Sequence, residues 1–136
     1  MRFGAAIAGM SLLMAASSVQ AAAPSAGVAE ARRWAGLMDR GAYEQSWLEA
    51  SEVFRQQTTK DAWVGTVGPI RDRFGAMSER NLIGEVDADT LSGVPGRGFK
   101  IVNFYSKFAG EPERVLESVV LMRDHGAWKV QDYYVK

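Results

Sequence analysis

Few side chains in this sequence could do acid–base, nucleophilic or metal chemistry. The chain contains no cysteine and a single histidine, His125, which stands in the turn-like segment Asp124-His125-Gly126. The lack of cysteine excludes thiol catalysis, disulfide bonds and thiolate metal sites. A histidine at a turn tip is usually structural, because catalysis needs the imidazole within hydrogen-bond reach of a substrate. Asp87 and Asp89 alternate along one segment but lack the loop spacing of a calcium site. We predict no metal and no cofactor.

The remaining candidates for a general base are two carboxylates near the C-terminus, Glu117 and Asp132. A catalytic carboxylate must lie inside a pocket that shifts its pKa, so the role of each depends on the sheet face that it occupies. Arg80 and Asp61 are other polar groups that could enter a pocket, although a surface ion pair is the commoner role for such residues.

Charge and length exclude further classes of function. The chain has 136 residues with 16 basic and 16 acidic side chains, so its formal net charge is zero. The two signs are interspersed, and no basic stripe supports binding to nucleic acid or to an anionic membrane surface. The length fits one domain.

The N-terminus has the pattern of a secretory signal peptide. Arg2 precedes the apolar run Phe3–Ala16, and Val19-Gln20-Ala21 offers small residues at the cleavage site. We expect cleavage after Ala21 and a periplasmic protein without a membrane span; an uncleaved anchor helix is the alternative, for which the apolar run is short. The expected organisation is a signal peptide over 1–21, a flexible lead-in over 22–27 and a single domain over 28–136.

Apolar residues at helical spacing occupy the first half of the domain. They predict one helix from Val28 to the glycine at position 41, a second from Ala42 through Phe54, and a third after a capping sequence at Thr58–Asp61. The third helix should end at Gly75, with a kink or a break into two short helices at Gly68-Pro69. The tryptophans of these helices are expected in the core, or in the wall of a ligand pocket.

The second half reads as strands joined by turns. Alternation predicts strands over 78–91, 99–108, 114–123 and 128–135. A two-residue turn at His125-Gly126 would pair Arg123 with Trp128 and Val119 with Asp132. A five-residue turn over 109–113 would pair Asn103 with Val119 and Tyr105 with Glu117. The sheet therefore acquires a face toward the helices and an outer face, and a slip of one residue would exchange them and bring Asp132 and Glu117 inward.

These registers assign the remaining candidate residues. Residues expected to line a pocket between helices and sheet are Trp34, Tyr43, Trp63, Phe104, Ser118 and Tyr133. Residues expected on the outer face, which mixes aromatic, aliphatic and charged side chains, are Tyr105, Val119, Leu121, Trp128, Val130 and Tyr134. So apolar an outer face predicts an association surface, preferably that of a homodimer, and otherwise a surface for a partner protein.

Several short segments, taken in order, resemble a known family. They include Gln45–Ser51, Thr59–Trp63, Phe74–Ala76, Glu117–Leu121 and Gly126–Tyr134. Together they resemble the bacterial exported family catalogued as domain of unknown function 4019, over roughly residues 29–136. The resemblance implies a small α+β domain of the NTF2-like or cystatin-like type, with helices across a curved antiparallel sheet of about four strands. It implies no catalytic or binding residues.

The sequence therefore favours an exported, non-catalytic domain that binds a small apolar ligand or a protein partner. An NTF2-like isomerase or hydrolase that uses Asp132 or Glu117 is the first alternative. A structural accessory module of an envelope assembly is the second.

Overall fold

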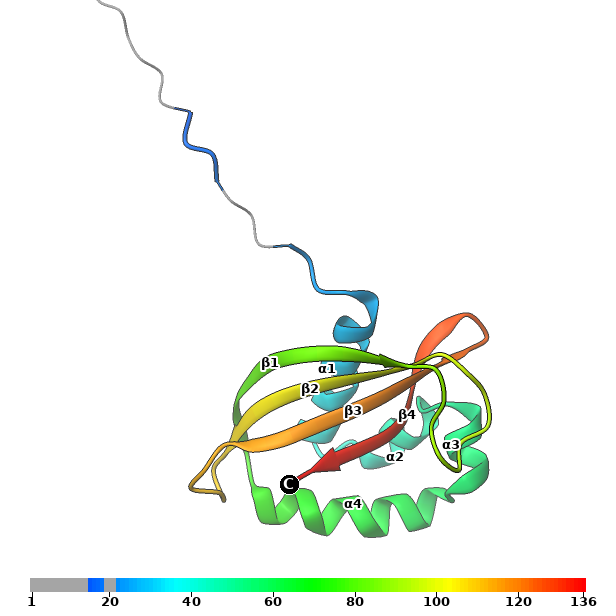
Figure 1. Ribbon diagram of the computed structural model, residues 1–136. Helices are drawn as coiled ribbons and strands as arrows, with labels where there is room; N and C mark the ends of the chain where they lie inside the picture. Colours follow the sequence, from blue (N-terminus) through cyan, green and yellow to red (C-terminus); the bar gives the residue numbers. More distant parts are fainter. Residues whose placement is uncertain (1–14, 19–21) are drawn as a thin grey trace, which may run out of the picture.

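The computed structural model describes residues 15–18 and 22–136. Four helices pack on one face of a four-stranded antiparallel sheet, which confirms the predicted α+β fold (Figure 1). The elements are α1 (Ala26–Asp39), α2 (Tyr43–Leu48), α3 (Glu52–Gln57), α4 (Lys60–Phe74), β1 (Met77–Ala88), β2 (Phe99–Phe108), β3 (Val115–Asp124) and β4 (Ala127–Val135). The strands lie in the order β1-β2-β3-β4, so each pairs with its neighbour in the chain.

The N-terminal segment bears on three predictions. The predicted signal peptide falls on residues 1–21, which lie outside the described residues except for 15–18. Helix α1 begins at Ala26, inside the predicted lead-in, because the hydroxyl of Ser25 accepts a hydrogen bond from the backbone N–H of Val28 and caps the helix. Across residues 15–18 and 22–136, no helix is long and apolar enough to cross a membrane.

Ser51 divides the predicted second helix into α2 and α3. Its hydroxyl accepts a hydrogen bond from the backbone N–H of Phe54, 3.0 Å away, and caps α3. Its own backbone N–H donates to the carbonyl of Val130 in β4 at 2.8 Å. The prediction of one continuous helix is wrong, because a serine that can cap a new helix competes with continuation of the old one.

Helix α4 begins and ends where the sequence predicts. Thr59 caps its start, and Gly75, with a φ of 76°, follows its last residue. The helix continues through Pro69 as a single element, so the alternative of two short helices is wrong. Pro69 lies on the exposed side of α4, where water can reach the carbonyl that proline leaves without a donor.

The register between β2 and β3 differs from the prediction by one residue. Asn103 pairs with Ser118 and Phe104 with Glu117. The strands are joined by residues 109–114 rather than by the predicted turn over 109–113. Since paired residues share a sheet face, this one-residue difference turns Glu117 toward the helices and Ser118 away from them.

A β-bulge shifts the register between β3 and β4. The predicted pair of Arg123 with Trp128 is confirmed, and Leu121 pairs with Val130. The next pair is Val120 with Asp132, so Gln131 is the extra residue. Val119 consequently pairs with Tyr133, and the prediction that it faces Asp132 is wrong.

The two register differences correct the predicted faces. Val119, Leu121 and Val130 are at most 2% exposed and belong to the core, so their prediction as outer-face residues is wrong. Trp128 also packs against the core, with the Arg123 guanidinium 4.2 Å from its ring centroid. Tyr105 and Tyr134 are both half exposed on the outer face, as predicted.

Candidate functional site

The space between the helices and the sheet is filled by aromatic side chains. Trp34 and Phe104 are fully buried, and Trp63 and Tyr133 are nearly so. The rings of Trp34 and Tyr133 lie 5.4 Å apart, and the indole N–H groups of Trp34 and Trp63 donate to the backbone and the hydroxyl of Ser46. The side chains predicted to wall a pocket here therefore pack on one another.

Two hollows lie beside this core. Trp63 and Tyr133 contribute to an apolar cleft of about 200 Å³ between α4 and the end of β4. Tyr43, which is half buried, borders a shallow hollow of about 360 Å³ at the end of α1, together with Asp39 and Arg71.

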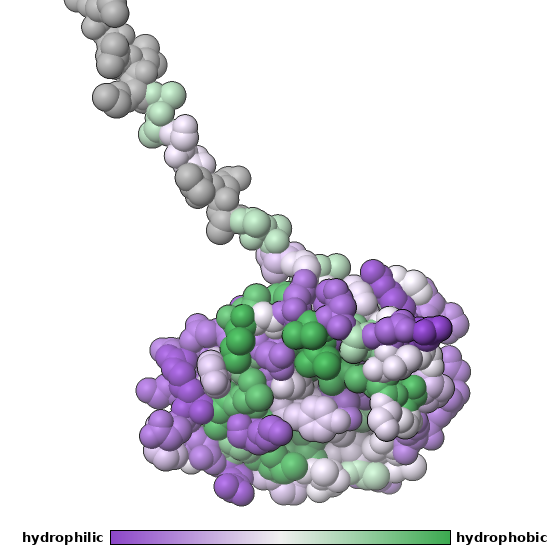
Figure 2. Space-filling model, in the orientation of Figure 1, coloured by the Kyte–Doolittle hydropathy of each residue, from purple (hydrophilic) through white to green (hydrophobic). Residues whose placement is uncertain are grey.

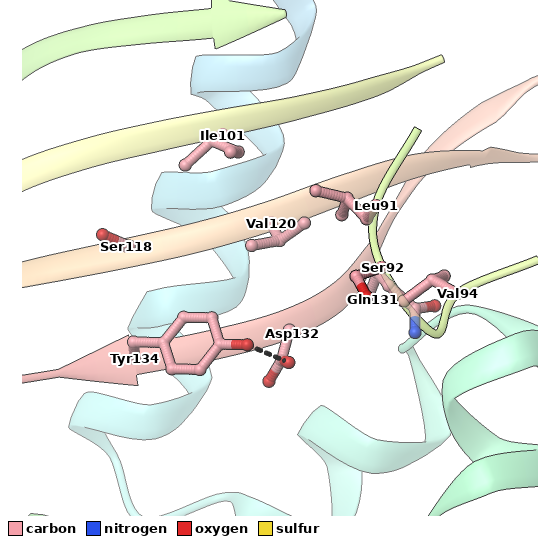
Figure 3. Close-up of a pocket in the computed structure, with 9 residues that line it drawn as sticks. All are labelled: Leu91, Ser92, Val94, Ile101, Ser118, Val120, Gln131, Asp132 and Tyr134. Atoms are coloured by element: carbon pink, nitrogen blue, oxygen red, sulfur yellow. Dashed lines mark hydrogen bonds between the residues drawn. The ribbon is translucent and has the colours of Figure 1, made fainter. Parts of the chain in front are cut away.

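A groove on the opposite side of the sheet, which we call the outer groove, is more apolar in its lining than the hollow beside Tyr43 (Figure 3). It has a volume of about 320 Å³ and lies between the outer face of β2, β3 and β4 and the loop that follows β1. Its lining residues are Leu91, Ser92, Val94, Ile101, Ser118, Val120, Gln131, Asp132 and Tyr134. Ser118 and Asp132 were predicted on opposite faces, and the corrected registers bring them to this one.

The loop side of the outer groove is built by a tight turn. The backbone N–H of Val94 donates to the carbonyl of Leu91 at 3.2 Å, and Gly93 has a φ of 75°, which a glycine adopts without strain. The side-chain amide of Gln57, at the end of α3, donates to the carbonyl of Gly93 at 3.2 Å. The turn is thereby attached to a helix as well as to the sheet.

The strand side of the outer groove carries one fixed carboxylate. Asp132 accepts a hydrogen bond from the phenol of Tyr134 at 2.5 Å and another from the backbone N–H of Tyr133 at 2.8 Å. The hydrogen bond to Asp132, with some burial, raises the pKa of Tyr134 to about 12. Ser118 donates to the side-chain oxygen of Asn103, which is an amide and cannot act as a base. These groups can bind and orient a ligand, but they form no nucleophile–base pair.

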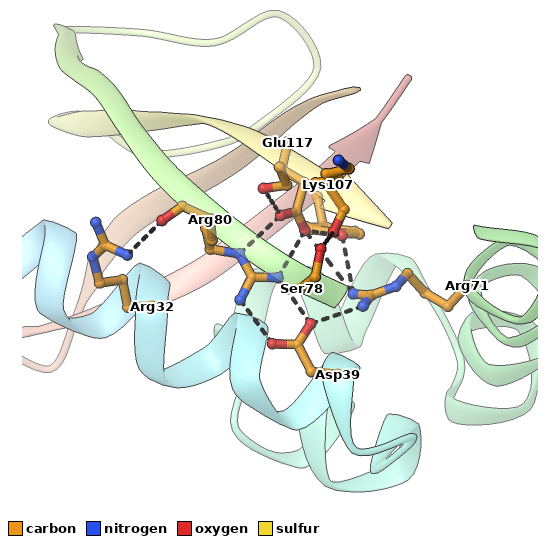
Figure 4. Close-up of polar contacts among 9 residues, drawn as sticks. Arg32, Asp39, Arg71, Ser78, Arg80, Lys107 and Glu117 are labelled. Carbon is orange, nitrogen blue, oxygen red and sulfur yellow. Dashed lines mark hydrogen bonds and ion pairs between the residues drawn. The ribbon is translucent and has the colours of Figure 1, made fainter. Parts of the chain in front are cut away.

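A second polar cluster is buried beneath the sheet (Figure 4). We call it the ion cluster, and its members are Asp39, Arg71, Arg80, Ser106, Glu117 and Tyr133. Glu117 is fully buried and accepts four hydrogen bonds: two from Arg80 at 2.8 and 3.2 Å, one from Tyr133 at 2.5 Å and one from Ser106. Arg80 also donates to both oxygens of Asp39, at 2.7 and 2.8 Å.

The surroundings of the ion cluster shift the pKa values of Asp39 and Tyr133 in opposite directions. Burial alone would raise the pKa of Asp39, but hydrogen bonds from Arg80 and Arg71 outweigh it and lower that pKa below its usual range. Burial and the neighbouring Glu117 raise the pKa of the Tyr133 phenol well above its ordinary value. Two arginines balance two carboxylates, which suits a buried structural cluster. Glu117, with its oxygens occupied and no access to solvent, is not placed to take a proton from a substrate.

Sequence reasoning missed Asp39 and Arg71. Arg71 follows Val67 by four residues and Trp63 by eight, so it lies on the buried face of α4. A charged residue on an apolar helical stripe indicates a buried partner, and that signal could have found the cluster. The Nε atom of Arg71 is buried and has no hydrogen-bond partner among the described residues.

Fold and site together define a small α+β domain with a filled core and an open groove on the outer face of its sheet. Residues 30–133 match the family described as "Protein of unknown function (DUF4019)", and the chain belongs to that family. The match confirms the resemblance seen in the sequence. No curated protein matches the chain.

Proposed function

We propose that the protein is an exported, non-catalytic binding domain and that the outer groove is its ligand site. The observation that carries the proposal is a groove that combines aliphatic walls with one fixed carboxylate, Asp132. The expected ligand is small and apolar and bears an amine or another hydrogen-bond donor. Export rests on the signal-peptide pattern of residues 1–21 and implies the periplasm.

The size and lining of the outer groove support this ligand class. Small-molecule sites commonly occupy about 300–1,000 Å³ and have mainly apolar walls with few polar groups. Leu91, Val94, Ile101 and Val120 supply apolar surface around the volume of about 320 Å³. Asp132 already accepts two hydrogen bonds, which fix its position, and a carboxylate retains lone pairs for a further donor.

The geometry favours binding over the enzymatic alternative. An NTF2-like isomerase or hydrolase would need Asp132 or Glu117 as a base inside a pocket. Glu117 is enclosed by the ion cluster, and Asp132 lies on the face away from the helices, where a tyrosine and a backbone N–H hold it.

Self-association through the outer face is the second candidate function. Figure 2 shows apolar side chains spread over the face of the sheet that is turned toward the viewer. Val86, Tyr105 and Tyr134 are each more than half exposed, and the pairing of Val86 with Ile101 places it on the same face as the outer groove. Of the residues expected at a dimer interface, only Tyr105 and Tyr134 remain in this proposal, because the other four pack into or against the core.

Calorimetry with three probes of equal length tests the ligand proposal: hexylamine, hexanol and hexanoate. We expect the chain from residue 22 to bind hexylamine most tightly, because only the amine both fills apolar walls and meets a carboxylate. Asp132→Asn should remove the preference for the amine and leave hexanol binding unchanged. The matched control Asp61→Asn, an exposed carboxylate at the start of α4, should keep it.

Equal binding of all three probes, or an amine preference that survives Asp132→Asn, would refute the ligand proposal. Light scattering after size exclusion tests self-association: a dimer that becomes a monomer when Tyr134 is replaced by Lys supports the second candidate. A monomer at micromolar concentration contradicts it. Native mass spectrometry of protein purified from its own envelope would show both oligomeric state and retained ligand.

A further inference from the structure

Three side chains of types that bind metal ions meet where the β3–β4 turn lies beside the start of α3. Asp124 and His125 come from the turn, and Glu52 comes from α3. Nε2 of His125 lies 3.3 Å from Oδ1 of Asp124 and 3.5 Å from Oε2 of Glu52. One ligand atom from each of the three residues lies within 4.8 Å of the others. Glu52 precedes Asp124 by 72 residues, so no local sequence pattern indicated this cluster, and no metal was predicted.

The two distances from Nε2 of His125 match the edges of a tetrahedral zinc site. Zinc binds imidazole nitrogen at about 2.0–2.1 Å and carboxylate oxygen at about 2.0–2.2 Å. Two ligands at such distances from a tetrahedral centre are about 3.3–3.5 Å apart. The imidazole nitrogen of His125 is therefore at the required distance from both carboxylate oxygens.

The backbone fixes the less exposed ligand. Oδ2 of Asp124 accepts a hydrogen bond from the backbone N–H of Glu52 at 2.8 Å, which leaves Oδ1 directed toward the imidazole. Such contacts from outside the ligand set orient metal-binding carboxylates. His125 has a φ of 50° and Gly126 a φ of 83°, as in a two-residue hairpin turn that presents the imidazole at its tip.

The charge of the cluster also suits a divalent cation. Two carboxylates and a neutral imidazole together carry two negative charges, which a divalent cation would neutralise. The nearby guanidinium of Arg123 donates to the carbonyl of Gly126 and stacks on Trp128, 4.2 Å from its ring centroid. Nitrogen and carboxylate oxygen together suit zinc and its neighbours in the transition series better than calcium or magnesium.

We propose that Glu52, Asp124 and His125 form a surface site for a divalent transition metal ion, with Zn²⁺ as the type ligand and water completing the coordination. The His125 and Glu52 side chains are 85% and 56% exposed, so the ion would be accessible to solvent. It would attach the start of α3 to the β3–β4 turn. The site is independent of the outer groove.

Calorimetric titration of the untagged chain from residue 22 with ZnCl₂ tests the site. His125 is the only histidine of the chain, so we expect one ion per molecule and loss of binding in His125→Asn. Asparagine tolerates a positive φ, and this variant therefore removes the imidazole without straining the turn. Glu52→Gln should weaken binding by at least about tenfold. Glu113→Gln, an exposed carboxylate at the opposite end of the sheet, is the matched control and should bind like the wild type.

Thermal melting gives a second measurement that does not depend on heats of binding. ZnCl₂ should raise the melting temperature of the wild type and of Glu113→Gln but not that of His125→Asn, because an ion that binds only the folded chain stabilises it. Zinc binding that is equal in wild type and His125→Asn would overturn the proposal. So would the absence of binding to a folded wild type, which would leave the cluster as a contact between a histidine and two carboxylates.

Discussion

Replacing Glu117 by glutamine should cause a large loss of stability. The substitution keeps the shape of the side chain but removes its charge, and an N–H₂ group replaces one of the two oxygens, each of which now accepts two hydrogen bonds. At least one donor, from Arg80, Ser106 or Tyr133, would then meet another donor instead of an acceptor. The side chain is fully buried, so water cannot repair the mismatch.

Removal of one partner from a buried ion pair costs about 3–5 kcal/mol. A domain of this size has a total stability of about 5–15 kcal/mol, so the loss is a large fraction of the total. With a slope of about 2 kcal/mol per molar urea, the unfolding midpoint should fall by about 1.5–2.5 M. Urea titration followed by tryptophan fluorescence measures this, since Trp34 and Trp63 are buried beside Tyr133.

The control is the same substitution in an exposed ion pair. Glu79 pairs with Arg114, and both side chains are about half exposed, so Glu79→Gln should cost less than about 1 kcal/mol. In the double variant Glu117→Gln/Arg80→Met, the loss should be smaller than the sum of the two single losses, because both substitutions remove the same pair of hydrogen bonds. If Glu117→Gln costs no more than Glu79→Gln, the reasoning about the ion cluster is wrong.

Three further substitutions test other parts of the structure. The arginine partners of Asp39 lower its pKa, so the stability that this carboxylate gives is present above about pH 4 and is lost as the pH falls through the lowered pKa. Urea titrations should therefore show that the wild type is more stable than Asp39→Asn at pH 7. The difference in stability should become smaller in acid. Ser51→Ala removes the cap of α3 and the partner of a buried amide, and should cost about 1–2 kcal/mol in the same assay. Gly110→Ala should cost about 1–3 kcal/mol, since its Cβ would lie 2.4 Å from the carbonyl oxygen of Arg73; Gly84→Ala, with no neighbour within 4 Å, should cost less, and equal losses would contradict the argument.

The helices and strands could be predicted because their signals are local. Caps at Thr59 and Gly75 fix the limits of α4 from residues that are adjacent in the chain. Alternation and turn residues likewise locate β2, β3 and β4 to within a residue or two. The break at Ser51 was missed because a serine reads equally as a helical residue and as a cap.

The sheet faces could not be predicted, because β3 is apolar on both sides. Residues 119–122 are all buried, so alternation gives no face for them. Which residues face the helices depends on the length of the loop between β2 and β3 and on the bulge at Gln131. Neither leaves a signal in the hydrophobic pattern. The outer groove depends on the same register, which is why Ser118 was expected beneath the sheet.

The ion cluster was missed for a related reason. Glu117 was expected on the outer face because the predicted register paired it with Tyr105. The cluster joins Glu117 to Arg80 of β1, which also binds Asp39 of α1, and Asp39 in turn binds Arg71 of α4; these residues are distant in sequence, and only the folded chain brings them together. Arg80, for which a surface ion pair was the commoner expectation, has a side chain that is only 6% exposed.

The order of the strands has a consequence for how the chain folds. Each strand pairs with its neighbour in sequence, so the hairpins can form by closing short loops. Helix α1, in contrast, packs against β2, β3 and β4, which are all far along the chain, so its contacts require the closure of long loops. We therefore expect a folding transition state in which the four-stranded sheet is largely formed and α1 has not yet packed against it. Val119→Ala should slow refolding, and Ala31→Gly should mainly accelerate unfolding. A refolding rate that is more sensitive to Ala31→Gly than to Val119→Ala would contradict this order and place the docking of α1 before the completion of the sheet.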